Sequence, residues 1–598
     1  MKRKTILAML TALPLAPTIA SAVRSIGTAA AFTRARPGTA RWPSMAQWTR
    51  LRAQVGGRLL TLRNAFTRCA TASECATLFN NLKNPYYINE TPNVTQTLGW
   101  LDAWTTHPSV YAVAAKSAAD VATAVMFARE HDLRVAVRGG GHSYQGTSNA
   151  PDSMLVWTHP MDQIVMHDAF VPQGCSSAPL HAVSVGAGNI WGRVYNAVTT
   201  QHGRYVQGGG CTTVGVAGLV SSGGFGSFSK NYGSAAGSLL EAEVVTADGK
   251  IRIANACQNS DLFWALKGGG GGTFGVITRL TLMTHDLPEF FGAAYGSIKA
   301  NSDAAYHRLI ERVVSFYAES LHNPHWGEQL GFHRSNFLSL SMVSQGLDQA
   351  ALQALWKPFF DWVATSPKDY SYREPVGVVA GPAQHWWDPD FIKRYDPHAV
   401  TIDPRAGANP RNFWWTGDGD QVGQFIYAFE SLWLPQSLLA TENRGRFVDA
   451  LFAATRHWTV GLHFNKGLSG APADAVARAR DTATNPAMLD AFALAIIAMS
   501  DQGIYPGLRG HEVKMSDAGQ YVSGVHSSMN ELRAIVPNGA SYVSEASYFD
   551  PHWQQQYWGS NYARLAQIKQ KYDPTGLFIV HNGVGSENWS RDGFTRLS

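Results

Sequence analysis

Short strand-like runs and longer runs of helical period follow one another through the middle of the chain, beginning near Trp104. The segment 111–116 (YAVAAK) alternates like a strand, and 133–139 (LRVAVRG) does the same. Between them, 117–132 (SAADVATAVMFAREHD) has helical spacing, with Ser117 as the candidate N-cap. The same alternation predicts further elements at 181–188, 191–203, 239–251, 261–268 and 274–285, with a turn at Asp248-Gly249. This pattern indicates an α+β domain over residues 104–287.

A different pattern begins after residue 287. The strand-like runs lie at 336–343, 424–434 and 457–464, and they alternate with helix-like runs at 302–321 and 485–500. This mixture predicts a second domain, 288–540, in which helices flank a sheet that we expect to be antiparallel.

Two terminal segments flank these domains. A lead over 23–103 is expected to be helical, because residues 45–66 have helical spacing. A C-terminal segment, 541–598, is expected to contain one last helix over 553–576, ended by Asp573-Pro574.

Residues 1–22 have the features of a signal peptide. A basic start (KRK) precedes an apolar stretch, and ASA at 20–22 fits a small-residue cleavage site. An organellar transit peptide is the alternative, because the start is rich in Arg and no Asp or Glu precedes Glu74. No later segment is apolar over about eighteen residues, so we expect no transmembrane span. We therefore expect a secreted or periplasmic protein.

The net charge of +5 does not indicate an acidic partner, because it comes from the basic residues before Glu74. The rest of the chain holds more acidic than basic residues and has no long basic run, so nucleic-acid binding is not expected. Nor do the His and Cys residues have a metal-site spacing. No GxSxG motif of an α/β-hydrolase is present.

The chain has five cysteines, and an odd number in an exported protein leaves one for another role. The flanking glycines nominate Cys211. The other four, Cys69, Cys75, Cys175 and Cys257, could form two disulfides in three possible pairings, which the sequence does not distinguish.

Three glycine clusters stand out in the first domain. RGGGHSYQG (138–146) and QGGGCTTVG (207–215) each place three glycines before a potential nucleophile, His142 and Cys211. Such clusters let backbone N–H groups approach a phosphate closely. The third cluster, GGGTFG (270–275), matches GxGxxG but stands between a helix and a strand, which is the reverse of the dinucleotide fingerprint. No GxxxxGK[ST] motif is present, so a P-loop is excluded.

With these motifs the chain resembles the berberine-bridge-enzyme-like flavoprotein oxidases of the vanillyl-alcohol-oxidase superfamily. The resemblance rests on the clusters above and on DLFWALKGGGGGTFGVITRL (261–280) and NYARLAQIKQKYDPTGLF (561–578). It implies that 104–287 is a PCMH-type FAD-binding domain of two α/β subdomains and that 288–540 is a substrate-binding domain. It further implies that 541–598 returns to the FAD-binding domain.

The same resemblance implies a cofactor held by two covalent bonds. His142 would bond the 8α-methyl carbon of FAD, and Cys211 would bond ring carbon 6. The residues implied to line the pyrophosphate are Arg138, Gly139, Gly140, Gly141, Ser143, Ser222, Gly223 and Gly224. Val214, Gly215 and Gly218 are further cofactor-binding residues, and Val276 would lie alongside the adenosine half.

The reacting side is less clearly marked. Tyr144 follows the His tether, and it either contacts the ring or simply packs. The family usually has a Tyr-x-Asn-Tyr-like segment where this chain has SYVSEASY (541–548), so Glu545 is the candidate polar substitute, with a surface glutamate as the alternative. His463, in the strand-like 457–464, is a candidate base or a buried structural histidine. Glu430 is a weaker candidate.

These features favour an FAD oxidase that takes a hydride from a small alcohol, sugar or secondary metabolite and passes electrons to O₂, giving H₂O₂. In the family, a small Val three residues after the tethering Cys resembles the oxygen-reactive members, and Val214 holds that place. A dehydrogenase with another acceptor is the nearest alternative. A catalytically silent flavin-bearing protein is a third.

Overall fold

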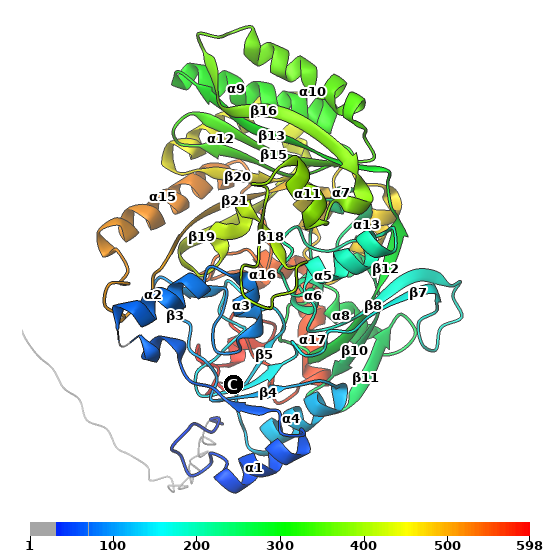
Figure 1. Cartoon of the computed structure of the whole chain (residues 1–598), viewed down its shortest axis with the longest axis vertical. Helices are drawn as coiled ribbons and strands as arrows, with labels where there is room; N and C mark the ends of the chain where they lie inside the picture. The colour runs from blue at the N-terminus through cyan, green and yellow to red at the C-terminus, as the bar shows by residue number, and fades with distance from the viewer. Residues whose placement is uncertain (1–31, 70, 598) are drawn as a thin grey trace, which may run out of the picture.

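The computed structural model describes residues 32–69 and 71–597 (Figure 1). The expected signal peptide, or the alternative transit peptide, lies outside these residues. The described chain forms a mixed α+β structure of three larger sheets and one small hairpin. In none of the described residues is there a helix that is long and apolar enough to cross a membrane.

The first sheet is built around a strand–helix–strand unit, as predicted. Its strands, in spatial order, are β1 (Leu59–Thr61), β4 (Tyr111–Ala114), β6 (Met154–Trp157) and β5 (Val135–Arg138). Helix α4 (Ala118–Glu130) connects β4 to β5, which both pair in parallel with β6. Its predicted N-cap is confirmed, because Ser117 Oγ accepts from the N–H of Asp120 at 3.2 Å.

The N-terminal lead is only partly helical, contrary to the prediction. Helix α1 (Met45–Gln54) ends before Gly56 and Gly57, which have φ of 60° and 82°. These left-handed residues stop the helix, and the chain continues as strand β1, which pairs with β4. Further along, β2 (Thr97–Trp100) and β3 (Trp104–Thr105) join a different sheet.

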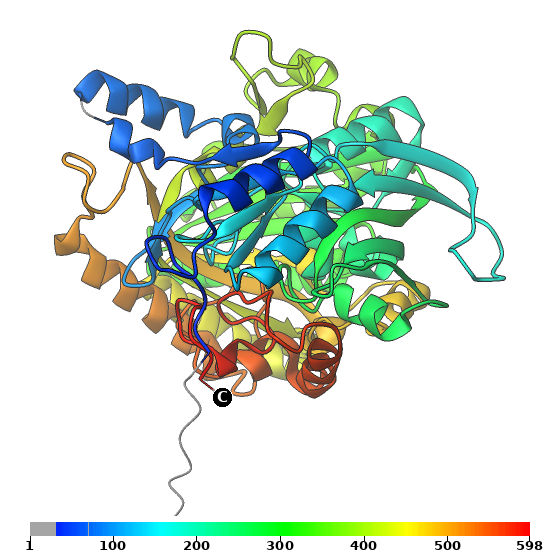
Figure 2. The same cartoon turned by 90° about the horizontal axis from the view of Figure 1, so that it is seen from below.

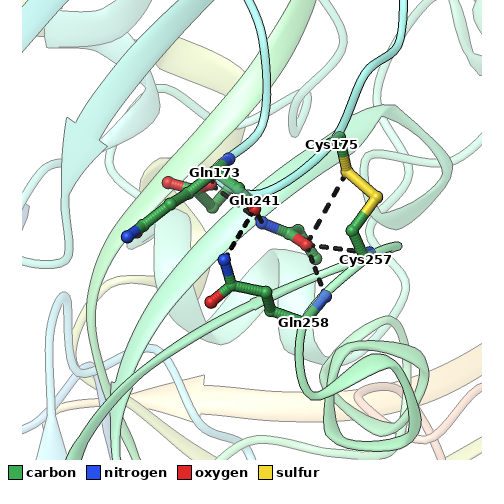
Figure 3. Close-up of a disulfide and its surroundings, with 6 residues drawn as sticks. Gln173, Cys175, Glu241, Cys257 and Gln258 are labelled. Atoms are coloured by element: carbon green, nitrogen blue, oxygen red, sulfur yellow. Dashed lines mark hydrogen bonds between the residues drawn. A yellow bond between two sulfur atoms is a disulfide. The ribbon is translucent and has the colours of Figure 1, made fainter.

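The second sheet is antiparallel and six-stranded. Its strands are β11 (Ile251–Asn255), β10 (Leu239–Val245), β12 (Val276–Asp286), β8 (Leu180–Gly186) and β7 (Ile164–Phe170), with β9 (Arg204–Val206) paired to β12. The predicted Asp248-Gly249 turn joins β10 to β11, and Gly249 has φ of 76°. A disulfide, Cys175–Cys257, ties the β7–β8 loop to the end of β11, with a Cα–Cα distance of 5.6 Å (Figure 3).

Asn255 organises the surroundings of this disulfide through hydrogen bonds on both sides of its amide. Its Nδ2 donates to the carbonyl of Gln173 and to the Glu241 carboxylate, and its Oδ1 accepts from the N–H of Cys257 at 2.9 Å. The expectation of two disulfides is wrong for this structure, because Cys69 and Cys75 are free thiols. They lie in contact, and burial together with Cys75 raises the pKa of Cys69 to about 12.

The third sheet has nine strands, and most of them lie in the upper half of the molecule in Figure 1. In spatial order they are β16 (Tyr370–Pro382), β13 (Phe290–Ala300), β15 (Phe337–Gln345), β14 (Trp326–His333), β20 (Val460–His463), β21 (Ala491–Gln502), β19 (Gln424–Pro435), β2 and β3. All pairings are antiparallel except β19–β2. Helices α9 (Asp303–Phe316), α10 (Gln349–Ala364), α12 (Thr441–His457) and α15 (Met515–Arg533) pack their apolar faces on the sheet.

One element of this domain differs from its prediction. The run 485–500 forms only the short helix α14 (Ala487–Asp490) and then the long strand β21. Ala491 to Ala495 are all buried, since both faces of the central strand are covered. A continuous apolar run of this kind cannot be assigned to helix or strand from its period alone.

Shorter helices connect and cover the sheets. They are α2 (Ala72–Asn81), α3 (Pro85–Glu90), α5 (Trp191–Tyr195), α6 (Val216–Ser221), α7 (Ser229–Tyr232), α8 (Ser260–Leu266), α11 (Pro389–Tyr395) and α13 (Ala473–Arg480). A separate hairpin, β17 (Val400–Ile402) with β18 (Phe413–Trp415), stands beside the nine-stranded sheet.

The C-terminal segment packs against the glycine-rich part of the chain. Its predicted single helix is two, α16 (Trp553–Trp558) and α17 (Tyr562–Tyr572), because Gly559 between them has φ of 54°. The indole of Trp558 donates to the carbonyl of Gly268 at 3.0 Å, and the buried ammonium of Lys569 donates to that of Thr273 at 2.6 Å.

The two ends of the described chain lie together (Figure 2). Thr33 forms a β-bridge with Thr595. The buried guanidinium of Arg34 donates to the carbonyls of Leu133 and Gly593, both at 3.0 Å. The Arg34 guanidinium thus joins the first described residues to the domain predicted over 104–287, at Leu133, and to the last described residues, at Gly593.

Candidate active site

The first two glycine clusters press directly against each other. A Cβ at Gly140 would lie 2.7 Å from the amide nitrogen of Gly215, and a Cβ at Gly215 would lie 2.6 Å from that of Gly140. Only glycine permits this approach of two backbones. The contact brings the His142 loop and the Cys211 loop together, and Thr213 Oγ1 lies 3.3 Å from His142 Nε2.

A long cavity runs from this contact between the two α/β subdomains and the C-terminal segment. It encloses about 1650 Å³, including the part open to solvent. Its walls come from the three glycine clusters, from residues 542–545 and 580–583, and from Lys466. Segments from the beginning, the middle and the end of the chain therefore share one binding site.

The polar groups of this cavity fit a phosphate-containing cofactor. No residue that the structure describes accepts a hydrogen bond from the backbone N–H of Gly140, Gly141 or His142. The buried Arg138 Nε and Gln145 Oε1 also have no partner. Gly218 faces open space, where a side chain would obstruct a ligand. Unpaired N–H groups beside glycines form the kind of concave site that binds phosphate.

The two potential tethers have shifted acid–base properties. Burial, with a smaller effect of Arg138, lowers the pKa of His142 to about 4, so its imidazole is neutral near pH 7. Burial, followed by the effect of Asp418, raises the pKa of the Cys211 thiol well above its usual range. Cys211 does not line the cavity itself, but Tyr144 and Lys466, which interact with it, both do.

Comparison with known proteins agrees with this arrangement. A family model described as an FAD binding domain matches residues 109–255, and one described as berberine and berberine like matches residues 541–585. The chain therefore contains the FAD-binding domain and the C-terminal segment of the berberine-bridge-enzyme-like flavoproteins.

The relatives of this flavoprotein match nearly its whole length. The FAD-linked oxidoreductase penH of Penicillium thymicola is 28% identical over 595 residues, which cover 93% of this chain and 94% of the relative. Among solved structures, the VAO-type flavoprotein MtVAO615 of Myceliophthora thermophila has a TM-score of 0.75 at 24% identity, covering 93% of this chain and 98% of that one.

A second solved structure has the same fold at lower similarity. The glucooligosaccharide oxidase of Acremonium strictum has a TM-score of 0.62 at 18% identity, with 89% and 98% of the two chains covered. That enzyme is described as carrying a 6-S-cysteinyl, 8α-N1-histidyl FAD.

Most of the expected cofactor residues of the flavoprotein line the cavity. These are Arg138, Gly139, Gly140, Gly141, His142, Ser143, Val214, Gly215, Gly218 and Ser222. The Arg138 guanidinium, however, is turned away to the carbonyls of Ile88, Thr91 and Val94. That side chain therefore supports the wall, and only its Nε remains unpaired.

Besides Cys211, three expected residues lie outside the wall. Val276 is fully buried in the core between the two smaller sheets, and the next residue of β12, Ile277, lines the cavity instead. Gly223 and Gly224 form the turn after α6, with φ of 105° and 76°. Neighbouring residues on a strand face opposite sides, so a shift of one position separates core from cavity.

Some of the candidate catalytic residues line the cavity and others do not. Tyr144 and Glu545 both line the cavity, and Glu545 forms an ion pair with Lys466 there. His463 does not line it, and His457 belongs to helix α12. The strand predicted over 457–464 is shorter than expected, because β20 spans only Val460–His463.

The weaker candidate, Glu430, lies elsewhere. Its carboxylate is 3.2 Å from the His526 ring and 2.6 Å from the Arg533 guanidinium, both on helix α15. It therefore faces the helical layer rather than the cavity.

Three polar residues near the two potential tethers were not found from the sequence. Asp418 and Gln421 belong to the 3₁₀ turn η6 (Thr416–Gln421), and Gln421 Oε1 accepts from the Tyr144 hydroxyl at 2.8 Å. Glu328 on β14 accepts from Ser227, and burial raises its pKa. None of them stands in a motif, so no local signal marked them.

Proposed function

We propose that this flavoprotein is an exported oxidase whose FAD is attached through both His142 and Cys211. Its substrate would be a small alcohol, sugar or secondary metabolite, and its electron acceptor O₂. The observation that carries the proposal is the contact of Gly140 with Gly215, which brings a His loop and a Cys loop to one end of a phosphate-binding cavity.

When bound, FAD supplies the electron acceptor for removal of a hydride from carbon. The chain's own residues would bind, orient and move protons. The neutral His142 has one unprotonated ring nitrogen, as attachment requires. The backbone N–H groups of the first glycine cluster would hold the pyrophosphate.

Tyr144 and Glu545 are the proposed acid–base groups at the reacting carbon. Both line the cavity, and Lys466 fixes the Glu545 carboxylate beside it. The Gln421 amide oxygen orients the Tyr144 hydroxyl. His463 is not retained as a candidate base, since burial and Lys466 lower its pKa well below the usual value and its side chain is outside the cavity wall.

Export is supported by the disulfide between Cys175 and Cys257, since such bonds persist mainly in oxidising compartments. It is also supported by the signal-like composition of residues 1–22. Determining the N-terminal residue of the protein recovered from the culture medium would test it.

The attachment is tested by denaturing electrophoresis with flavin fluorescence. His142→Ala and Cys211→Ala should each keep fluorescent flavin on the denatured chain, because the other bond remains. The double variant should lose it. Cys75→Ala is the control for removal of a buried thiol remote from the cavity, and it should keep full fluorescence.

Loss of all flavin from either single variant would contradict the double attachment. Bleaching of the flavin absorbance by alcohols, sugars and aromatic alcohols, followed by peroxide release in air, then identifies the substrate class. Bleaching without peroxide would move the assignment to a dehydrogenase.

A further inference from the structure

The Cys211 thiol lies against the carboxylate of Asp418, which accepts its hydrogen bond. The two residues come from parts of the chain far apart in sequence, the second glycine cluster and the turn η6. Neither Asp418 nor any other residue of η6 was assigned a role by the sequence.

The approach of Asp418 to Cys211 is built into the fold. Beside the cysteine, the Thr212 hydroxyl donates to the carbonyl of Phe413 at 2.9 Å. The same carbonyl accepts from the Tyr86 hydroxyl at 2.9 Å. Strand β18, which begins at Phe413, runs directly into η6. The hydrogen bond from Thr212 to Phe413 thus joins the glycine cluster to β18 one residue after Cys211 and five residues before Asp418.

The other side of η6 is held as well. The side-chain amide of Gln502 donates to the carbonyls of Gly419 at 2.9 Å and Val422 at 2.6 Å. Gln421 accepts from Tyr144. The Asp418 carboxylate is therefore positioned from both ends of its turn, as a group must be if it is to act on one particular atom.

The charged groups around the thiol explain why it needs a base. Cys211 faces two carboxylates, Asp418 and Glu328, and one cation, Lys466. The thiolate is the nucleophilic form of cysteine, and burial and the two carboxylates oppose its formation. A proton acceptor at the sulfur atom is therefore required for any attack by Cys211.

We propose that Asp418 is the general base for formation of the bond between Cys211 and the cofactor. This inference rests on the proposed double attachment. Asp418 takes the thiol proton as the Sγ–H bond breaks and a bond from Sγ to ring carbon 6 forms. The hydrogen of that carbon leaves as a proton, and the two remaining electrons pass to O₂, which with two protons gives H₂O₂.

The other two carboxylates of this part of the molecule, Glu328 and Glu545, are already engaged. Glu328 accepts from the Ser227 hydroxyl, and Glu545 is paired with Lys466. Across residues 32–69 and 71–597, no salt bridge includes Asp418. Burial, with a further effect of Glu328, raises its pKa to about 6, so it can both accept and release a proton near neutral pH.

The test uses the His142→Ala protein, in which Cys211 is the single remaining attachment point. The protein is prepared without flavin and mixed with FAD. Attachment is followed with time by acid precipitation and by the mass of the peptide that contains Cys211. Asp418→Asn should slow attachment about 100-fold, within the range that general base catalysis contributes. Asp418→Glu should retain most of the rate.

Two controls separate this role from a structural one. Asp420→Asn changes an exposed carboxylate of the same turn and should attach flavin at the parent rate. Retention of FAD on gel filtration before precipitation measures reversible binding, which Asp418→Asn should leave intact. Its attachment should also accelerate with rising pH, as hydroxide replaces the missing base.

The possible failures are distinguishable. If the His142→Ala protein itself never bonds flavin at Cys211, the double attachment is wrong. If it does and Asp418→Asn attaches equally fast, Asp418 is not the base. Equal loss in the Asn and Glu variants, with unchanged reversible binding, would also overturn the proposal, because the carboxyl group would then not be what matters.

Discussion

Val214 is the cavity residue through which the proposed choice of O₂ as electron acceptor can be tested. It is half-buried, lines the cavity three residues after Cys211, and packs at the edge of the core formed by β8, β10 and β12. Its carbonyl accepts from the N–H of Trp191 at 3.1 Å, so its position is fixed by the backbone. The size of its side chain then sets the space at this point of the cavity.

Val214→Leu should slow reoxidation of the reduced protein by O₂ by about tenfold or more. The added methylene fills space of molecular size in a packed wall. Stopped-flow mixing of the photoreduced protein with air-saturated buffer measures the rate. Val543→Leu, the same change elsewhere in the cavity wall, should reoxidise like the wild type. A wild type that is slow with O₂ but fast with a quinone would contradict the oxidase.

Single residues also show how much of the candidate site could be predicted from the sequence. His142, Tyr144 and Glu545 could be found because each stands in or beside a recognisable segment. Asp418 and Glu328 could not, because their approach to Cys211 depends on how β18, η6 and β14 are placed by the whole fold. The core position of Val276 was missed through a single step of strand register.

At the scale of elements, local chemistry decided which predictions held. Helix α4 was predictable because Ser117, a helical period and two strand-like neighbours all agree. Strand β21 was not, because its apolar run fits a buried helix equally well. The short strands β2 and β3 exist only through pairing with β19 and with each other, which no local pattern records.

The disulfide is the element-scale feature with the clearest energetic consequence. It closes a loop with a sequence separation of 82, which includes β8, β9 and β10. Cys175→Ser should lower the free energy of unfolding by about 2–4 kcal/mol, because the unfolded chain gains loop freedom. Denaturant unfolding monitored by tryptophan fluorescence measures this.

Cys75→Ser serves as the control for the disulfide, since the structure leaves that thiol unpaired. The same sample gives a thiol count. The denatured, unreduced wild type should expose two titratable thiols, Cys69 and Cys75, if Cys211 carries flavin. An equal loss of stability in both variants would contradict the assigned pairing.

At the scale of the whole molecule, buried histidines govern the response to acid. Five histidines outside the tether site have a pKa lowered to about 4, with burial as the largest cause: His159, His285, His322, His333 and His581. In the unfolded chain they bind protons from about pH 6.5 downwards. Between pH 6.5 and 4 the unfolded state therefore binds more protons, and stability falls as pH falls.

The midpoint of thermal unfolding should accordingly decrease steadily from pH 6.5 to 4.5. Asp418, whose pKa is raised to about 6, and Glu328, whose pKa is raised by burial, act in the opposite direction but are outnumbered by the histidines. His285→Phe should lessen the decrease, because the buried Nε2 of His285 has no partner and its ring packs on Tyr205 and Tyr232. A midpoint that is level or rises towards pH 4.5 would show that other groups dominate.

The junction of the two chain ends has a consequence for the order of events during biosynthesis. Arg34 binds carbonyls that follow it by most of the chain, and residues 580–583 close the cavity that His142 opens. A ribosome-bound chain that has emerged only as far as the nine-stranded sheet has neither contact. Cofactor loading must therefore wait until residues 580–583 have emerged, and a protein that ends at residue 578 should be made without its yellow colour.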